Sequence, residues 1–254
     1  MASFLVGVAI AIAVGLATSQ LATYTTTIYL HRALAHRAMT LRGVLRFPAR
    51  MVLWMTTGIV PRQWVAVHRK HHAFTDEPGD PHSPKILGWK RVQLANFMLY
   101  RREARDPAIV ARYAKDLPPD RWDRVLFDHG LLGLGLGVAL LVWLLGPWLG
   151  LLAAVVHTAS YIQLNSAVNA IGHTFGKRPH PNSATNLQWL AIITGGEGLH
   201  NNHHAAPTSA TMRLSKGEFD PAWPLIWLGA RVGLIRIRLH ETRLVGRPRP
   251  AAPA

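Results

Sequence analysis

Two long apolar segments divide the chain and predict its membrane-spanning helices. Residues 2–30 contain no charged side chain, which gives enough length for one span of about 20 residues and too little for two. Residues 125–171 form a second apolar segment of 47 residues, in which Asp128 is the only Asp, Glu, Lys or Arg. Proline cannot continue a helix, so Gly146-Pro147 predicts a tight turn between two helices here. The predicted spans are residues 3–28, 128–145 and 148–171.

The charged residues predict how these spans are oriented. Lys and Arg number 28 against 13 Asp and Glu, which gives a net charge of +15. All 28 lie outside the two apolar segments, eighteen between them and ten after the second. If the first segment crosses once and the second twice, both basic regions share one side, which the positive-inside rule makes cytoplasmic. Topology therefore accounts for the charge, and we expect membrane lipid, and no nucleic acid, as a partner.

Histidine supplies the candidate metal chemistry. The chain has 14 histidines and no cysteine, so thiolate ligands, disulfides and iron–sulfur clusters are excluded. Nine imidazoles are too many for one ion, whereas four or five for each of two ions would suit Fe, Zn, Cu or Ni. The nine that gather at the predicted ends of the spans are His31, His36, His68, His71, His72, His173, His200, His203 and His204.

The spacing of these histidines predicts how they are held. Residues i, i+3 and i+4 share one face of a helix, so each His-x-x-His-His cluster, at 68–72 and at 200–204, can aim three imidazoles at one point. His31 and His36 are five residues apart, a turn of about 500° in an α-helix, and we expect this pair to lie across a helix end. A structural zinc site fits poorly, because such sites use four ligands and usually include Cys.

Residues 44–67 lie between two of the clusters and are apolar but charged. Only 31 residues separate His36 from His68, whereas two crossings need about 40 residues and a turn. One crossing would place these histidines on opposite sides of the membrane. We therefore predict an interfacial amphipathic helix over 44–67, with its arginines toward water and its tryptophans at the level of the headgroups. The residues concerned are Arg46, Arg50, Arg62, Trp54 and Trp64.

Four local sequences resemble the membrane fatty acid desaturase superfamily, and within it the stearoyl-CoA (delta-9) desaturase branch of the short bacterial type. They are YLHRALAHR at 29–37, WVAVHRKHH at 64–72, DPHS at 80–83 and GEGLHNNHH at 196–204. The glycine-framed last motif is the most specific of them. The resemblance extends over about residues 21–239. The chain differs from animal relatives in having one apolar span before the first histidine pair, where they have two, and in having no fused haem domain.

The resemblance implies an all-α integral membrane protein of mushroom shape, with about three transmembrane helices, the interfacial helix and a cytosolic helical cap that holds a di-iron site. It implies that the nine histidines bind two iron ions and that Asn169, four residues before His173, holds a water on one iron. We interpret His82, Asp80 and Glu197 as residues that support the ligands from behind. For Glu197, capping of a turn is the alternative.

The resemblance also implies the reaction. It is an O2-dependent desaturation that introduces a cis double bond, at the delta-9 position, into a saturated fatty acyl chain carried on CoA or on a phospholipid. No acid or base side chain can remove hydrogen from an unactivated methylene group, so a metal-based oxidant is required. A narrow tunnel would present one pair of carbons to the iron, and Thr23 and Thr27 are candidates for its lining. Without a flavin or nicotinamide fingerprint, the chain needs an external electron donor, a ferredoxin or small cytochrome with its reductase.

Two other classes of function fit part of this pattern. A hydroxylase, ketolase or alkane monooxygenase could use the same scaffold, and its product would carry an added oxygen. A non-enzymatic membrane metal-binding or transport protein would place its ligands near the middle of the bilayer, whereas these histidines lie at the ends of the predicted spans. The motifs at 80–83 and 196–204 favour desaturation over the first of these classes, and the position of the histidines disfavours the second.

One domain is expected over residues 1–245, in the bacterial inner membrane, with the metal site and the C-terminus on the cytoplasmic side. No internal repeat divides the chain, and the histidine clusters require its distant parts to fold together. The last nine residues, 246–254, are rich in Pro, Arg and Ala, and we expect them to be disordered.

Overall fold

The structure, a computed structural model, describes residues 2–239, 242, 244 and 245. The segment 246–254, for which disorder is expected, lies outside the described residues. The described part of the chain is mostly helical, as predicted, and a small two-stranded sheet accompanies the helices.

Two long helices form the centre of the fold. α1 (Ala2–Thr25) continues without a break into a π-helix, η1 (Thr26–Ala35), and together they are long and apolar enough to cross a membrane. α8 (Pro147–Ala170) packs along α1. The two backbones approach so closely at Gly15 that an added Cβ would lie 2.6 Å from the carbonyl oxygen of Ala153. Small residues allow such close packing between membrane helices, so Gly15 fixes how α1 and α8 meet.

A tight turn joins α8 to the helix before it, α7 (Gly130–Leu145), as predicted. Gly146 forms this turn with a φ of 82°, a left-handed conformation that glycine adopts readily. Among the described residues, length and composition mark two helices as candidate spans, the α1–η1 helix and α8. α7 has 16 residues, about 24 Å, and is shorter than a bilayer core of about 30 Å. The crossing of α7, and with it the number of spans, stays a prediction.

The segment 44–67 differs from the single helix that we predicted. It is divided between α2 (Gly43–Thr57) and α3 (Pro61–Ala73). Gly58 ends α2 in the left-handed conformation, with a φ of 63°. Pro61 begins α3 at the first helical position, where the N–H that proline lacks would have no partner within the helix. Glycine and proline therefore break the helix at a place that the hydrophobic pattern alone does not reveal.

The side chains of α2 also differ from the expected interfacial pattern. Trp54 is 3% exposed, and its indole N–H donates to the carbonyl oxygen of His129 (3.0 Å) instead of lying among headgroups. Arg50 is paired with Asp120 and Asp123, with an N–O distance of 2.7 Å in each pair. α2 packs between α1 and α7, and the interfacial position of 44–67 as a whole stays a prediction.

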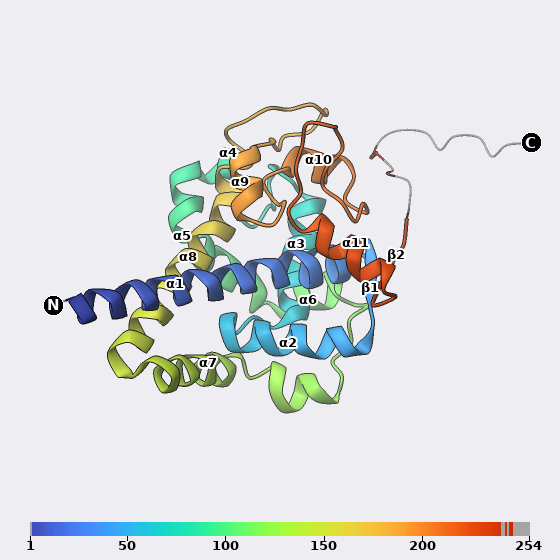
Figure 1. Cartoon of the computed structure of the whole chain (residues 1–254). Coiled ribbons are helices and arrows are strands. Elements are labelled where there is room, and N and C mark those ends of the chain that lie inside the picture. The colour runs from blue at the N-terminus through green and yellow to red at the C-terminus, as the bar shows by residue number, and fades with distance from the viewer. Residues whose placement is uncertain (1, 240–241, 243, 246–254) are drawn as a thin grey trace, which may run out of the picture.

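Shorter elements complete the described part of the chain. They are β1 (Met39–Leu41), α4 (Pro84–Leu87), α5 (Trp89–Ala104), α6 (Pro107–Tyr113), η2 (Asp123–Phe127), α9 (Gln188–Ile193), α10 (His200–Ala205), α11 (Trp223–Arg231) and β2 (Ile235–Ile237). β1 and β2 pair antiparallel, with Met39 opposite Ile237, and join the chain after η1 to the C-terminal segment. α1 runs through the whole molecule, and the short elements α10, α11, β1 and β2 lie toward its far end (Figure 1).

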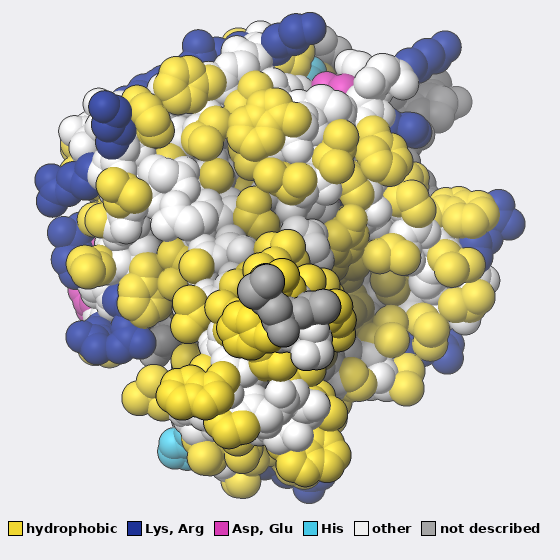
Figure 2. Space-filling view, turned by 60° about the vertical axis from the view of Figure 1, so that its left-hand side comes forward, with side chains coloured by type: hydrophobic (Ala, Val, Ile, Leu, Met, Phe, Trp, Pro, Cys, Tyr) yellow, Lys and Arg dark blue, Asp and Glu magenta, His cyan; other side chains and the backbone are white. Residues whose placement is uncertain are grey.

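Hydrophobic side chains cover the end of the molecule at which α1 begins. Figure 2 turns this end toward the viewer and shows them around the start of α1, with Lys and Arg mainly at the margins. Near the turn between α7 and α8, Trp143 and Trp148 are 79% and 84% exposed. Tryptophan is enriched where lipid tails meet headgroups, and extended apolar surfaces mark contact with lipid or protein. This end of the protein is therefore suited to the bilayer.

We expect the α7–α8 turn and the histidine-rich end to lie on opposite sides of the membrane. Because the chain has no cysteine, a single Cys introduced at Trp148 or at Arg178, both exposed, can be labelled alone. In intact cells, a membrane-impermeant maleimide should label the Trp148→Cys variant and leave the Arg178→Cys variant unlabelled until the cells are opened. Equal labelling of both variants in intact cells would contradict three crossings.

Candidate metal centre

The nine histidines are carried by separate elements that meet beyond the ends of α1 and α8. His31 lies in η1 and His36 directly follows it, across the helix end that their spacing predicts. Backbone bonds in a π-helix run from residue i to residue i+5, and the N–H of His36 donates to the carbonyl oxygen of His31 (3.1 Å). This wide turn places the two ring centroids 4.9 Å apart. The π-helix is therefore the local structure that lets two histidines five residues apart act together.

The structure sorts the nine imidazoles into two groups, in each of which the candidate ligand nitrogens lie within 4.8 Å of one another. The five-histidine group comprises His31, His36, His68, His72 and His203, and the four-histidine group comprises His71, His173, His200 and His204. Each His-x-x-His-His cluster is thus divided between the groups, which differs from our expectation that its three imidazoles aim at one point. Adjacent residues of a helix point about 100° apart, so His71 and His72 diverge.

Imidazole nitrogens face one another at contact distance within both groups. Ligand nitrogens that lie about 2.1 Å from a shared cation would be about 3.0–3.4 Å apart. The structure has spacings close to this. The distances between Nε2 atoms are 2.7 Å for His36–His68, 2.9 Å for His72–His203, 3.1 Å for His31–His203, 3.2 Å for His200–His204 and 3.4 Å for His71–His204. Nε2 of His173 is buried and has no hydrogen-bond partner among the residues that the structure describes, which leaves a further lone pair for a cation.

Burial keeps most of these imidazoles neutral. Desolvation lowers the pKa of six histidines well below the ordinary value of 6.5, and the repulsion that they would meet from neighbouring histidines, if these were protonated, lowers it further. The six are His36, His68, His72, His200, His203 and His204. A neutral imidazole has a free lone pair, and a donor set made of nitrogen suits Fe, Zn, Cu or Ni. The residues therefore fit two metal ions, and the choice of iron stays a prediction.

Three carboxylates orient one ligand candidate each. The Nδ1–H of His31 donates to Glu197 (2.7 Å), and the Nδ1–H of His71 donates to Asp80 (3.0 Å). A carboxylate at Nδ1 fixes the tautomer and directs Nε2 toward the metal position. The structure thus brings two of the predicted supporting residues, Asp80 and Glu197, against candidate ligands.

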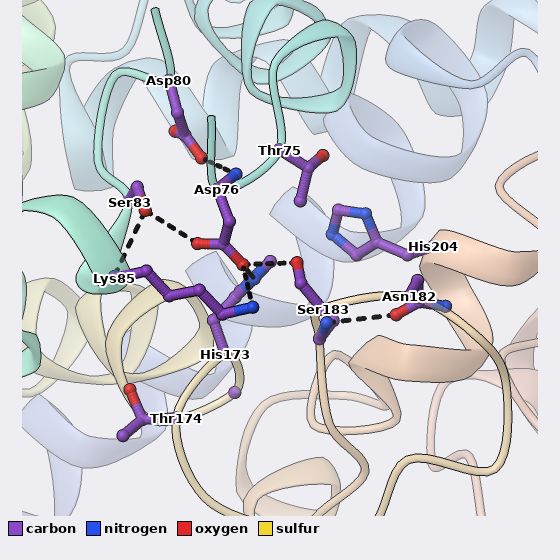
Figure 3. A network of polar contacts seen from close by, with 12 residues as sticks. Thr75, Asp76, Asp80, Ser83, Lys85, His173, Thr174, Asn182, Ser183 and His204 are labelled. Carbon is purple, nitrogen blue, oxygen red and sulfur yellow. Dashed lines mark hydrogen bonds and ion pairs between the residues drawn. The ribbon is translucent and has the colours of Figure 1, made fainter. Parts of the chain in front are cut away.

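Asp76 is the third of these carboxylates, and the sequence alone does not distinguish it from its neighbour Glu77 as a support for a ligand. It accepts the Nδ1–H of His173 (2.9 Å) and the hydroxyls of Ser83 (2.8 Å) and Ser183, and Nζ of Lys85 lies 3.7 Å away (Figure 3). Burial raises the pKa of the Asp76 carboxyl, but these hydrogen bonds outweigh burial and hold the pKa well below its usual range. The φ of Asp76 is 60°, a left-handed conformation in which Asp is one of the tolerated residues. Asp76 therefore joins two distant loops behind His173.

His82 lies behind the four-histidine group. Its ring is 4.8 Å from that of His71, and its backbone N–H donates to Asp80 (3.0 Å). Both ring nitrogens are buried without a partner in the described part of the chain. Burial lowers the pKa of His82 to about 3, with a further contribution from His71. His82 is therefore a neutral group against the candidate ligand His71, and its supporting role stays a prediction.

Asn169 lies in the last turn of α8, on the wall of a cavity. Its amide donates to the carbonyl oxygen of Asn165 at 3.4 Å, a long contact that leaves the carbonyl end of the side chain free for another partner. His200 of the four-histidine group lines the same cavity. This position is compatible with a water held between Asn169 and a metal ion, which stays a prediction.

The cavity has a volume of about 250 Å³ and extends from the histidines between the helices. His31 and His68 of the five-histidine group and His200 of the four-histidine group form part of its wall. Thr23 and Thr27, the predicted tunnel residues, line it as well. Both groups of histidines therefore meet a single space that is large enough to hold a segment of a hydrocarbon chain.

The chain matches known proteins over most of its length. Residues 3–235 match the family model described as Fatty acid desaturase. The chain is similar to the sn-1 stearoyl-lipid 9-desaturase of Synechocystis sp. (29% identical over 83% of this chain and 65% of that protein), the sn-2 palmitoyl-lipid 9-desaturase of Nostoc sp. (32%, 81% and 73%) and the acyl-CoA C20 Delta5-desaturase of Anemone leveillei (31%, 82% and 67%). It thus spans 65–73% of the length of these relatives. The matches confirm the resemblance to delta-9 desaturases.

Replacement of Asp76 should weaken the four-histidine group. In the Asp76→Asn variant an amide replaces the carboxylate that orients His173, and loss of such a partner costs about 10–100-fold in metal affinity. After dialysis against a chelator, elemental analysis should find less metal per chain than in the unaltered protein. The matched control is Glu77→Gln, which removes a neighbouring, exposed carboxylate and should leave the metal content unchanged. Equal metal content in both variants would contradict the role of Asp76.

The metal-free protein should lose stability as the pH falls from 7 to 5. Below the ordinary pKa of 6.5, the unfolded chain binds protons on histidines that the folded chain keeps neutral, so the free energy of unfolding decreases. Asp76 and Asp80 also have lowered pKa values, but they change the free energy of unfolding only at lower pH, because the ordinary pKa of an Asp carboxyl is 3.8. The midpoint of thermal unfolding of metal-free protein in detergent measures the effect, and a constant or rising midpoint between pH 7 and pH 5 would rule it out.

Proposed function

Because the chain belongs to the fatty acid desaturase family, we propose that it is an O2-dependent di-iron fatty acyl desaturase. It introduces a cis double bond, at the delta-9 position, into a saturated acyl chain carried on CoA or on a phospholipid. The observation that best supports this proposal is that two separate groups of imidazoles reach the wall of one cavity. An acyl chain in this cavity would have neighbouring carbons next to both groups.

Desaturation of an unactivated acyl chain needs a stronger oxidant than any side chain of this protein. Two iron ions bound at the site would generate this oxidant from O2. In the overall reaction, O2 takes two electrons from the acyl chain and two from an external donor, and it is reduced to two waters. The residues of the chain have other tasks. The histidines hold the ions, the carboxylates behind them fix the imidazoles, and the cavity wall orients the acyl chain and excludes water.

Thr27 connects the cavity wall with a candidate ligand. Its hydroxyl donates to the carboxylate oxygen of Glu197 that also accepts the Nδ1–H of His31. Trp64 also lines the cavity and stacks on His68, with ring planes 9° apart. The wall that contacts the acyl chain is therefore in direct contact with the five-histidine group. Contact of this kind would keep one pair of carbons in a fixed position while hydrogen is removed.

Electrons would reach the site from a separate protein. The chain has no cysteine and no flavin or nicotinamide fingerprint, so a ferredoxin or small cytochrome with its reductase is the expected donor. We expect this donor on the cytoplasmic side of a bacterial inner membrane, where the positive-inside rule places the basic regions of the chain. Membrane lipid surrounds the spans there, and no nucleic acid is required.

Expression in a host that requires unsaturated fatty acids tests the proposed function. The unaltered chain should restore growth and produce a new monounsaturated acyl species, whose double-bond position gas chromatography with mass spectrometry reports. His200→Ala should abolish the product, because His200 is a member of the four-histidine group. His180→Ala is the matched control and should keep it, because His180 lies outside both groups and contacts Asn201 through its backbone.

The products distinguish the other candidate functions. Hydroxylated or oxidised acyl chains would identify a monooxygenase on the same scaffold. Absence of any product, from folded and iron-loaded protein with a competent electron donor, would refute an enzymatic role for ordinary acyl chains. In that case a membrane metal-binding protein would be the better explanation of the two histidine groups.

A further inference from the structure

The cavity beside the histidines reaches the protein surface between α5 and α8. Most of the residues that line it are buried or half-buried. Two lining residues are exposed, Phe97 on α5 and Thr158 on α8, and 50% of the surface of Phe97 is accessible. The two helices pack against each other, so these residues mark an opening in the side of the helix bundle, which we call the lateral mouth.

The surface around the lateral mouth is apolar. On α5, Leu94 and Met98 are 76% and 74% exposed, and together with Phe97 they have the i, i+3, i+4 spacing of one helix face. On α8, Val155 is 65% exposed. An exposed apolar face of this kind is suited to contact with hydrocarbon and would be unfavourable in water.

Charged residues are absent from the mouth but frame it. Residues 92–100 of α5 and residues 130–170 contain no Asp, Glu, Lys or Arg. Basic residues precede and follow the uncharged part of α5: Lys90, Arg91, Arg101 and Arg102. Lys90 lies about 10 Å along the helix from Phe97. Such cations can bind lipid phosphates at the membrane surface while the apolar centre of α5 contacts the acyl chains.

The lining of the cavity does not suit a phosphate-rich soluble carrier. Within the described part of the chain, none of the lining residues is Lys or Arg, although the chain has 28 of them. Recognition of phosphate groups depends on such cations or on helix N-termini. The polar lining residues are mostly neutral, among them Thr56, Thr57 and Asn96. An acyl chain can enter this space, and a nucleotide phosphate would find no counter-charge at its wall.

We propose that the substrate acyl chain enters through the lateral mouth directly from the bilayer, while it is still esterified to a membrane phospholipid. The headgroup stays at the membrane surface near the basic ends of α5, and the acyl chain passes Phe97 and Thr158 into the cavity. This inference rests on the proposed function, because it takes the cavity to hold the acyl chain. It selects the phospholipid from the two carriers that the sequence leaves open.

Photo-crosslinking in vesicles tests the lateral mouth without the need for turnover. The full chain is reconstituted in phosphatidylcholine vesicles that contain a phosphatidylcholine with a diazirine in the middle of its palmitoyl chain. Surrounding lipid labels exposed residues such as Met98 in any case. Lipid that has entered the cavity should also label Tyr161 and Thr26, which line it and are 8% and 6% exposed. Mass spectrometry of the digested protein locates the label.

Two tryptophan substitutions on α8 provide the matched comparison. Thr158→Trp places an indole in the mouth and should reduce the labelling of Tyr161 and Thr26 about tenfold or more. Val155→Trp adds the same side chain to an exposed residue that does not line the cavity, and it should leave the labelling unchanged. If Thr158→Trp does not fold, Phe97→Trp fills the mouth from α5 instead.

The same vesicles separate this inference from the proposed function. Lateral entry is supported if Tyr161 and Thr26 are labelled in the unaltered protein and this labelling is lost in Thr158→Trp. This holds even if the protein forms no double bond. Labelling restricted to exposed residues, or buried labelling that is equal in both variants, would overturn it. Buried labelling by the diazirine palmitoyl chain supplied as a CoA thioester, with none from the phospholipid, would also overturn it and would leave a desaturase that takes its substrate from the cytoplasm.

Discussion

The structure depends on the electrostatics of nine imidazoles crowded into one buried and half-buried cluster. Their nitrogens approach to between 2.7 and 3.4 Å, and most of them are held neutral by burial. Two unprotonated nitrogens at this distance repel one another unless a proton or a metal ion lies between them, and a charged imidazole would be costly to bury. Packing of the remaining helices and loops holds these imidazoles together in spite of their repulsion. A metal ion bound in each group would turn the repulsion into an attraction that holds η1, α3 and α10 together.

Carboxylates and buried charge pairs hold this centre from outside. Asp76, Asp80 and Glu197 each fix one imidazole, and Asp76 does so from a left-handed backbone conformation. Next to His31, Arg32 forms a fully buried pair with Asp220 (2.9 Å) and donates to the carbonyl oxygen of Gly195 (3.0 Å). That pair connects η1 to the chain before Glu197 and to the C-terminal region. Removal of one partner from such a pair leaves an uncompensated charge, so these residues specify one arrangement of the segments.

The sequence predicts the parts of this protein that periodicity and spacing control. The apolar segments become α1, α7 and α8, and the five-residue spacing of His31 and His36 corresponds to a helix end. The sequence predicts less where three-dimensional packing determines which side chains meet. The division of each His-x-x-His-His cluster depends on where the partner helix lies. The helix break at Gly58 and Pro61 is a local backbone effect inside an apolar pattern. Asp76 could not be distinguished from Glu77 by sequence, because only the folded loop brings it to His173.

The division of both triplets between the two groups has a consequence for biogenesis. Each group takes members from α3 and from α10, which are separated by more than a hundred residues of chain. A ribosome that has made the protein as far as α8 has released five of the nine histidines, and neither group is complete at that stage. If each group binds an ion, neither ion could be fully enclosed before α10 has been made and packed against α3. Metal binding would then follow the formation of the long helices α1, α7 and α8.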